Sequence, residues 1–456
     1  MWKLRSFASN KYLLLILLVC SIQLSRADGL EGLNGLNGLN QPMSEYSSTE
    51  HSAALTLSAA LSRVQLENIG LAEIQARAQA MAAIPSQVGS LPDPMISFNA
   101  LNLPTDSFNV SQEAMTQMQF SISQQIPYPG KLVLKQSVAR RIANVADSTV
   151  DEMRLKLNQD VKTIWWQLFL LDRSLDVIEI NKTLLRQFIE IAQTKYKVGQ
   201  GLQQDVLLAQ LELSKLIDYT IQLTSSRKQS AAQLNVLLNQ PSNQTVRLPA
   251  LAEIDIVLPQ LISAKSIFNI AEQHRPALAQ QRLLIDAATD RKKLAERDLL
   301  PDFNVGAAYG FRDGNNTNGA DRADFLSFKV GINVPIFAQH KQKMAISQRH
   351  SEVKQQQFAL QDRWLNIQAD ITSTIAQYEQ AKEQVLLFKT GIIPQAHQTV
   401  ASMLAGYQVN KVDFLNLIRA QITLYNYQTN EWKAISDAKT ALAKLVATVG
   451  EENIYE

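Results

Sequence analysis

The chain has 456 residues, of which 46% are hydrophobic and 19% are charged, and its formal net charge is +2. This composition excludes a disordered chain, because it supplies ample apolar material for a folded core. The nearly balanced charge does not indicate nucleic-acid binding, and we expect no nucleic-acid partner.

Residues 1–27 have the pattern of a secretory signal peptide. A basic start precedes an almost wholly apolar run over residues 12–19, and Ala27 ends a small-residue cleavage site. Two alternatives are a retained membrane anchor and a lipoprotein that is acylated on Cys20, the only cysteine. Cleavage after Ala27 would leave no cysteine, and therefore no disulfide, in the mature chain. Residues 28–50 begin with a three-residue Gly-Leu repeat that predicts a flexible leader.

The chain from residue 51 onward contains an internal repeat with an offset of about 209 residues. The clearest repeated stretches are Leu91-Pro92-Asp93 with Leu300-Pro301-Asp302, and Tyr196-Lys197-Val198-Gly199 with Tyr407-Gln408-Val409-Asn410. We expect two structural repeats, residues 51–240 and 276–450, around a connector at 241–275. Each repeat should hold a helix, two strands and a long helical hairpin. The helix before the first strand is expected at about 53–83, and the prolines that follow, Pro85, Pro92 and Pro94, would end it.

Four segments, at about 94–102, 115–126, 302–311 and 325–336, alternate apolar and polar residues, as strands with one apolar face do. Such strands suit either a half-buried sheet of a soluble protein or a transmembrane barrel. Four strands cannot close a barrel, and an open sheet edge is not tolerated in lipid. Three chains would supply twelve strands, so a membrane location predicts a homotrimer.

Two helical hairpins, at 131–240 and 339–449, make up most of the remaining chain. Residues 131–198 form a run of 68 residues without glycine or proline. As one helix this run would be ~100 Å long, and it would need other helices beside it. The second hairpin contains Gly391 and Pro394. Because proline removes a backbone hydrogen bond, we expect a hinge there.

The sequence contains no recognisable catalytic motif. It has no phosphate-binding loop, no His-Glu-x-x-His zinc motif and no Gly-x-Ser-x-Gly nucleophile turn, and its five histidines are scattered. We therefore expect neither an enzyme nor a cofactor or metal site.

Three features of the chain are similar to the TolC-type outer-membrane efflux protein family over essentially its whole mature length. They are Gln125-Ile126-Pro127 with Gly130-Lys131, Asn333-Val334-Pro335-Ile336-Phe337, and the paired turns that begin at Tyr196 and Tyr407. Further stretches resemble the heavy-metal branch of that family. These are Asp93-Pro94-Met95, Asn102-Leu103-Pro104, and Ser107-Phe108 with Met115-Thr116.

The resemblance implies a mainly α-helical protein with a transmembrane β-barrel. It implies a homotrimer in the outer membrane of a Gram-negative cell, surrounded by outer-membrane lipid. The 12-stranded barrel would continue into a long α-helical barrel that extends through the periplasm. The trimer would passively export small solutes, in that branch heavy-metal cations. An inner-membrane efflux pump of the resistance-nodulation-division type and a periplasmic adaptor would deliver them. Alternatives are a protein-secretion duct of the same family and a soluble periplasmic coiled-coil adaptor or scaffold.

The resemblance also implies roles for the two hairpin turns. Docking of the adaptor is expected at Val198, Gly199, Gln200, Gly201, Val409, Asn410, Lys411 and Val412. A periplasmic gate is expected at Asp205, Asp413, Asn416 and Arg419. Asn416 and Arg419 stand where relatives carry acids, so we expect Arg419 to pair with an acid, Asp205 or Asp413, of a neighbouring helix. Asn410 replaces a glycine that is usual at this turn, and asparagine tolerates the left-handed backbone that the turn needs. The hinge at Gly391 and Pro394 would let the second hairpin swing while the first stays anchored.

Overall fold

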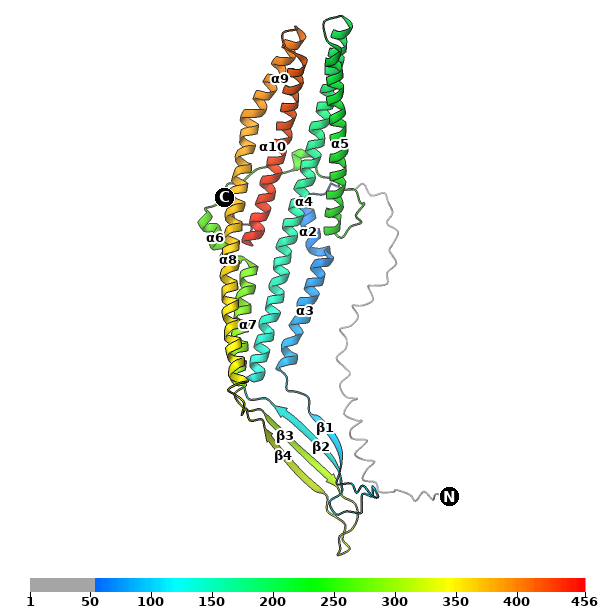
Figure 1. The fold of residues 1–456 in the computed structure, drawn as a ribbon, viewed down its shortest axis with the longest axis vertical. Helices are drawn as coiled ribbons and strands as arrows, with labels where there is room; N and C mark the ends of the chain where they lie inside the picture. The colour runs from blue at the N-terminus through cyan, green and yellow to red at the C-terminus, as the bar shows by residue number, and fades with distance from the viewer. Residues whose placement is uncertain (1–53, 456) are drawn as a thin grey trace, which may run out of the picture. The chain divides into compact units, whose positions relative to one another are not determined.

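The computed structural model describes residues 54–455 (Figure 1). The expected signal peptide, the leader and Cys20 lie outside these residues. The described chain is mainly helical with one small antiparallel sheet. Its helices are α2 Leu57–Glu67, α3 Ile69–Gly89, α4 Lys131–Lys197, α5 Gln203–Leu237, η2 Leu251–Glu253, α6 Ala264–His274, α7 Pro276–Arg297, α8 Gln342–Leu387, η3 Phe388–Ile392, α9 Ile393–Gln408 and α10 Phe414–Val449. Its strands are β1 Met95–Leu101, β2 Gln117–Ile126, β3 Phe303–Phe311 and β4 Phe325–Ile332. None of the helices between residues 54 and 455 combines the length and the apolarity that a membrane crossing needs.

Helix α4 is the element against which most of the other helices pack. Near the sheet it contacts α3 and α7, and farther along it contacts α5 and α10 (Figure 1). Helix α8 lies beside α7 and α10. The predicted 68-residue run is confirmed as one helix, α4, that ends at Lys197. Its length is possible because partners cover it on both sides along its course.

The largest core cluster lies where α4 passes α2, α3 and α5. Trp165, Trp166 and Phe169 are almost wholly buried there, and the ring centroids of Trp166 and Phe169 are 5.1 Å apart. The indole Nε1 of Trp165 donates a hydrogen bond of 3.1 Å to the carbonyl of Leu55. This bond fixes the chain that leads into α2 against the long helix.

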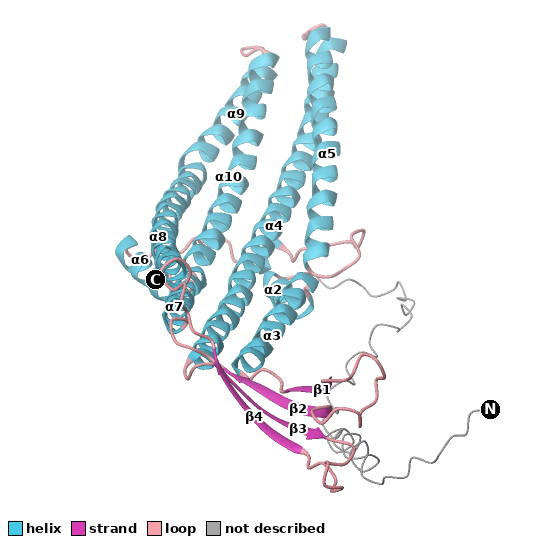
Figure 2. Cartoon of the chain, turned by 60° about the horizontal axis from the view of Figure 1, so that its bottom comes forward, coloured by secondary structure: helices cyan, strands magenta, loops and turns pink. Residues whose placement is uncertain are grey.

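The sheet has the order β1-β2-β3-β4, with every neighbouring pair antiparallel (Figure 2). One face is apolar and exposed in this single chain. Its cross-strand rows run Phe98–Phe120–Tyr309–Leu326 and Ile96–Ile122–Ala307–Phe328. Phe328 is 79% exposed and Val330 is 76% exposed. An apolar area of this extent marks an interaction surface, because soluble monomers rarely leave one uncovered.

The opposite face of the sheet carries small and polar residues. One of its rows is Ser97–Ser121–Ala308–Ser327, in which the two serine hydroxyls of β1 and β2 are 2.7 Å apart. Lys329 belongs to the same face of β4. Within the described chain, β1 and β4 each pair on one side only, so each leaves one edge of backbone groups for another strand.

The junction between strand and helix depends on Lys131. Gly130 has φ +91° and leads into α4. Lys131 is 4% exposed. Its ammonium group lies 2.9 Å from an Asp302 oxygen and 3.2 Å from an Asp298 oxygen. It also donates to the Leu300 carbonyl at 3.1 Å. The Gly-Lys pair thus ties the first turn of α4 to the segment that enters β3.

Three expectations about element boundaries were wrong. The helix expected at about 53–83 is two helices, because Asn68 has an extended backbone and its side chain accepts a hydrogen bond of 2.9 Å from the Leu71 amide. Asparagine caps a helix in this way. Pro85 does not end the second of these helices, since α3 continues to Gly89. Strands β1, β2 and β3 lie close to their expected bounds, whereas β4 ends at Ile332 and the sequence predicted an end near residue 336.

Candidate functional site

The first hairpin turn joins α4 to α5 through a Schellman motif. The amide of Gly199 donates to the Tyr196 carbonyl at 3.1 Å, and the amide of Gln200 donates to the Lys195 carbonyl at 2.8 Å. Gly199 has φ +74°, the left-handed conformation that this motif requires. The chain then extends through Leu202 before α5 begins.

The second turn, between α9 and α10, repeats this motif residue by residue. The amide of Asn410 donates to the Tyr407 carbonyl at 3.1 Å, and the amide of Lys411 donates to the Gly406 carbonyl at 2.8 Å. Asn410 has φ +62°, which confirms that asparagine adopts the left-handed position expected from the sequence. The correspondence of Val198-Gly199 with Val409-Asn410 therefore reflects one backbone geometry.

In each turn one glycine faces a side chain across a close contact, but the glycine stands after the turn in the first hairpin and before it in the second. In the first turn, a Cβ on Gly201 would come within 2.9 Å of the Lys195 Cβ. In the second turn, a Cβ on Gly406 would come within 2.6 Å of a Val412 methyl carbon. Gly406 corresponds to Lys195, and Val412 corresponds to Gly201. Each turn therefore has room for one side chain at this contact and requires glycine opposite it.

Polar contacts join the two turns of one chain. The ammonium group of Lys195 donates to the side-chain oxygen of Asn410 and lies 4.9 Å from the ring centroid of Tyr407. The hydroxyl of Tyr407 donates to an Asp205 carboxylate oxygen at 3.3 Å. Burial, and then the Asp205 carboxylate, raise the pKa of Tyr407 to about 12. The phenol therefore stays protonated and remains a donor at neutral pH. We call Lys195, Asp205, Tyr407 and Asn410 the tip cluster.

Of the four predicted gate residues, only Asp205 belongs to the tip cluster. Asp413 precedes α10 and is exposed, as are Asn416 and Arg419 on its first turns. Within residues 54–455 of one chain, no ion pair joins Arg419 to an acid. Pairing of Arg419 with Asp205 or Asp413 of a neighbouring helix stays a prediction.

Sequence reasoning missed Lys195 and used Tyr407 only as a marker of the repeat. Lys195 is 8% exposed although it is a lysine close to a turn. One signal was available in the sequence. Lys195 and Gly406 occupy the same place of the repeat, four residues before the left-handed residue, and only one of them has a side chain.

The turns also present apolar side chains to solvent in this single chain. Val198 and Val409 are each 63% exposed, and Leu202 and Tyr196 are 59% and 49% exposed. These residues flank the left-handed positions and lie at the ends of the two hairpins farthest from the sheet (Figure 1). A partner that docks here would bury them.

The second hairpin contains a π-helical turn at the predicted hinge. Segment η3 spans Phe388–Ile392 and includes Gly391, and Pro394 follows within the first turn of α9. The ring of Phe388 lies 5.9 Å from that of Tyr427 on α10. The first hairpin has no such turn, since α4 is continuous. π-turns of this kind often occur at functional sites.

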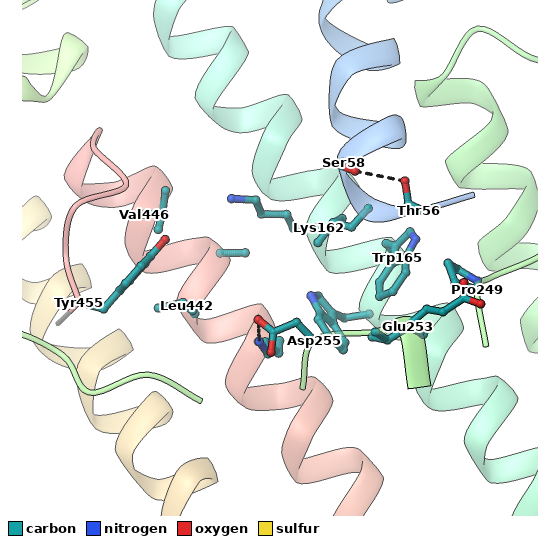
Figure 3. Close-up of a pocket in the computed structure, with 15 residues that line it drawn as sticks. Thr56, Ser58, Lys162, Trp165, Pro249, Glu253, Asp255, Leu442, Val446 and Tyr455 are labelled. Atoms are coloured by element: carbon teal, nitrogen blue, oxygen red, sulfur yellow. Dashed lines mark hydrogen bonds and ion pairs between the residues drawn. The ribbon is translucent and has the colours of Figure 1, made fainter. Parts of the chain in front are cut away.

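A cavity of about 390 Å³ lies in the region where α2, α4, the connector and α10 meet (Figure 3). Both of its lysines are paired with acids. The Lys439 ammonium lies 3.8 Å from an Asp255 oxygen and 5.4 Å from the Trp166 ring centroid, and Lys162 lies 3.1 Å from a Glu452 oxygen. Burial lowers the pKa of Lys439, and Asp255 opposes that effect. These pairs hold the connector and the C-terminal segment against the helices. Within the described residues, no group of three or more His, Cys, Asp or Glu side chains is arranged to hold a metal ion.

Comparison with known proteins gives a family match for part of the chain and a shared fold for most of it. Residues 267–451 match the family described as "Outer membrane efflux protein". No curated protein sequence matches the chain. Three solved structures have the same fold over most of their length. The outer-membrane channel OprN has a TM-score of 0.72 at 15% identity and covers 86% of this chain and 89% of its own. VceC from Vibrio cholerae has a TM-score of 0.71 at 14% identity, with coverage of 87% and 96%. CusC has a TM-score of 0.72 at 14% identity, with coverage of 88% and 93%. The chain thus matches the outer membrane efflux protein family in sequence over residues 267–451, and its described residues have the fold of these three channels.

Proposed function

We propose that the protein is the outer-membrane channel of a tripartite efflux system. In this proposal three copies form a passive duct, and an inner-membrane pump supplies the energy. A periplasmic adaptor joins that pump to the two hairpin turns. The family match over residues 267–451 and the fold shared with outer-membrane channels support this proposal.

One observation carries the proposal most directly, namely the sheet with an exposed apolar face and two unpaired edges. Leu326, Phe328 and Val330 alternate along β4 with Ser327 and Lys329. In a membrane barrel the apolar residues contact lipid and the polar ones face the lumen. A soluble periplasmic adaptor would leave the apolar face without a partner.

The unpaired edges predict the oligomeric state. Lipid offers no hydrogen bonds to the free edges of β1 and β4, so the β4 edge of one copy must pair with the β1 edge of the next. We expect a homotrimer with a closed barrel, and native mass spectrometry of the purified protein in detergent will show three chains. A stable monomer or dimer in that measurement would contradict the proposal.

The cargo is proposed from the stretches that resemble the heavy-metal branch. We expect that deletion of the gene lowers the concentration of transition-metal salts, divalent or monovalent, at which the cells stop growing. Growth in graded metal salts and in graded organic antibiotics, with and without a plasmid copy of the gene, will measure this. Unchanged metal tolerance combined with greater sensitivity to the antibiotics would assign the protein to drug efflux instead.

A further inference from the structure

We propose that Asn181 and Gln421 form an internal latch, which holds the second hairpin against the first at a level below the hairpin turns. This inference rests on the proposed function, because it concerns how the turn end of the duct is kept closed. We call these two residues the amide latch.

The amide latch is a direct bond between the two hairpins. The side-chain nitrogen of Gln421 on α10 donates to the side-chain oxygen of Asn181 on α4 at 2.6 Å. The side-chain nitrogen of Asn181 donates in turn to the Val177 carbonyl of its own helix at 2.7 Å. The two residues are 1% and 2% exposed. Water is therefore excluded from both amides in this structure.

The surroundings of the amide latch are apolar. Its neighbours along the two helices include Ile178, Leu185, Leu417 and Leu424, all buried. In such surroundings the loss of one partner leaves a polar group without a hydrogen bond, which costs more than the bond contributes when it is intact. Partial separation of the helices is thus unfavourable until water can enter.

The position of the latch relates it to the hinge. The ring contact of Phe388 with Tyr427 places the π-turn opposite Tyr427 of α10. Gln421 lies on the turn side of that level, whereas Ser436 lies on the other side and donates to the Trp166 carbonyl at 3.0 Å. A swing of the second hairpin about the π-turn would therefore separate Gln421 from Asn181 and leave the Ser436 contact in place.

The latch is separate from the tip cluster. Lys195 follows Asn181 by fourteen residues on the same helix, which corresponds to ~21 Å along its axis. The tip cluster borders solvent, and a docked adaptor would reach it directly. The amide latch is out of reach of a partner at the turns. It therefore responds only when the helices themselves move apart.

Hydrogen exchange followed by mass spectrometry tests the latch in the purified full-length protein. Gln421→Leu and Asn181→Leu each leave one buried side-chain amide without its hydrogen-bond partner. We therefore expect backbone amides between residues 403 and 424 to exchange about tenfold faster than in the wild type. Peptides from residues 276–297, near the sheet, should exchange at the wild-type rate. Asn426→Leu is the matched control, because Asn426 is an exposed amide on the same helix and its loss should change nothing.

Two double variants separate a latch from a simple loss of folding. The double variant Asn181→Gln with Gln421→Asn keeps two side-chain amides whose combined length is unchanged. Their hydrogen bond can form, so this variant should restore the wild-type rate. Asn181→Leu with Gln421→Leu removes both polar groups and should exchange no faster than the wild type. If the single variants exchange like Asn426→Leu, or if neither double variant restores slow exchange, the latch is overturned.

The exchange experiment does not depend on transport. Native mass spectrometry in detergent tests the proposed channel, and a stable monomer or dimer there would overturn that proposal. The exchange rates would still report whether the two amides hold the hairpins together.

Discussion

Phe328→Arg is expected to prevent stable insertion of the protein into membranes. Phe328 is at the middle of β4 on the apolar face and is 79% exposed in the single chain. An arginine on the lipid face near the bilayer midplane costs ~2–4 kcal/mol. Each trimer would carry three such residues, so the total penalty is comparable to the whole stability of many domains. The measurement is the fraction of protein that remains in outer membranes after a urea wash.

Ser327→Arg is the matched control for this prediction. Ser327 is the neighbouring residue of the same strand, on the face that already carries Lys329. The lumen of a barrel is aqueous, so this variant should remain in the membrane fraction. Equal membrane retention of the two variants would contradict the assignment of the apolar face to lipid.

Lys195→Met is expected to raise the conductance of the protein in planar bilayers. The substitution keeps the apolar stem of the side chain but removes the bond to Asn410 and the cation–π contact with Tyr407. A hydrogen bond that involves a charged group contributes ~1.5–3 kcal/mol, which corresponds to at least a tenfold change in the fraction of open channels. Conductance of single purified trimers will show this as longer or more frequent open periods.

Two other variants define the cause of that rise. Lys197→Met removes a lysine from the same turn that is exposed in the structure, and it should leave conductance unchanged. Arg419→Ala tests the separate proposal that Arg419 pairs with Asp205 or Asp413 of a neighbouring helix, and a rise in conductance there would support it. An unchanged open fraction in Lys195→Met would show that the tip cluster does not restrain the second hairpin.

The elements that could be predicted from sequence are those that depend on local patterns. The uninterrupted run after Gly130 predicted α4 almost to the residue, and period-two alternation predicted the strands. The repeated Tyr-x-Val pattern predicted both turns. These features follow from backbone chemistry within a few residues, and distant parts of the chain do not alter them.

The contacts that assemble the site could not be predicted in the same way. Lys195 and Asn410 are 215 residues apart in sequence, and Asn181 and Gln421 are 240 apart. Single lysine, asparagine and glutamine residues in long polar helices show no pattern that distinguishes a buried partner from an exposed one. Arg419 was expected at the gate because it stands where relatives carry acids, and this expectation stays a prediction, whereas the buried contacts of Lys195 and Tyr407 left no such signal.

The paired glycines of the two turns have a consequence for how this sequence can change over time. A side chain gained at Gly201 meets Lys195, and one gained at Gly406 meets Val412, so neither substitution is acceptable alone. Either turn could change to the arrangement of the other only if both of its contact positions changed together. Residues 195 and 201 should therefore covary among descendants of this gene, as should residues 406 and 412. Lys195 can occupy its buried place only because residue 201 is glycine. The two turns therefore share one backbone motif but are not interchangeable.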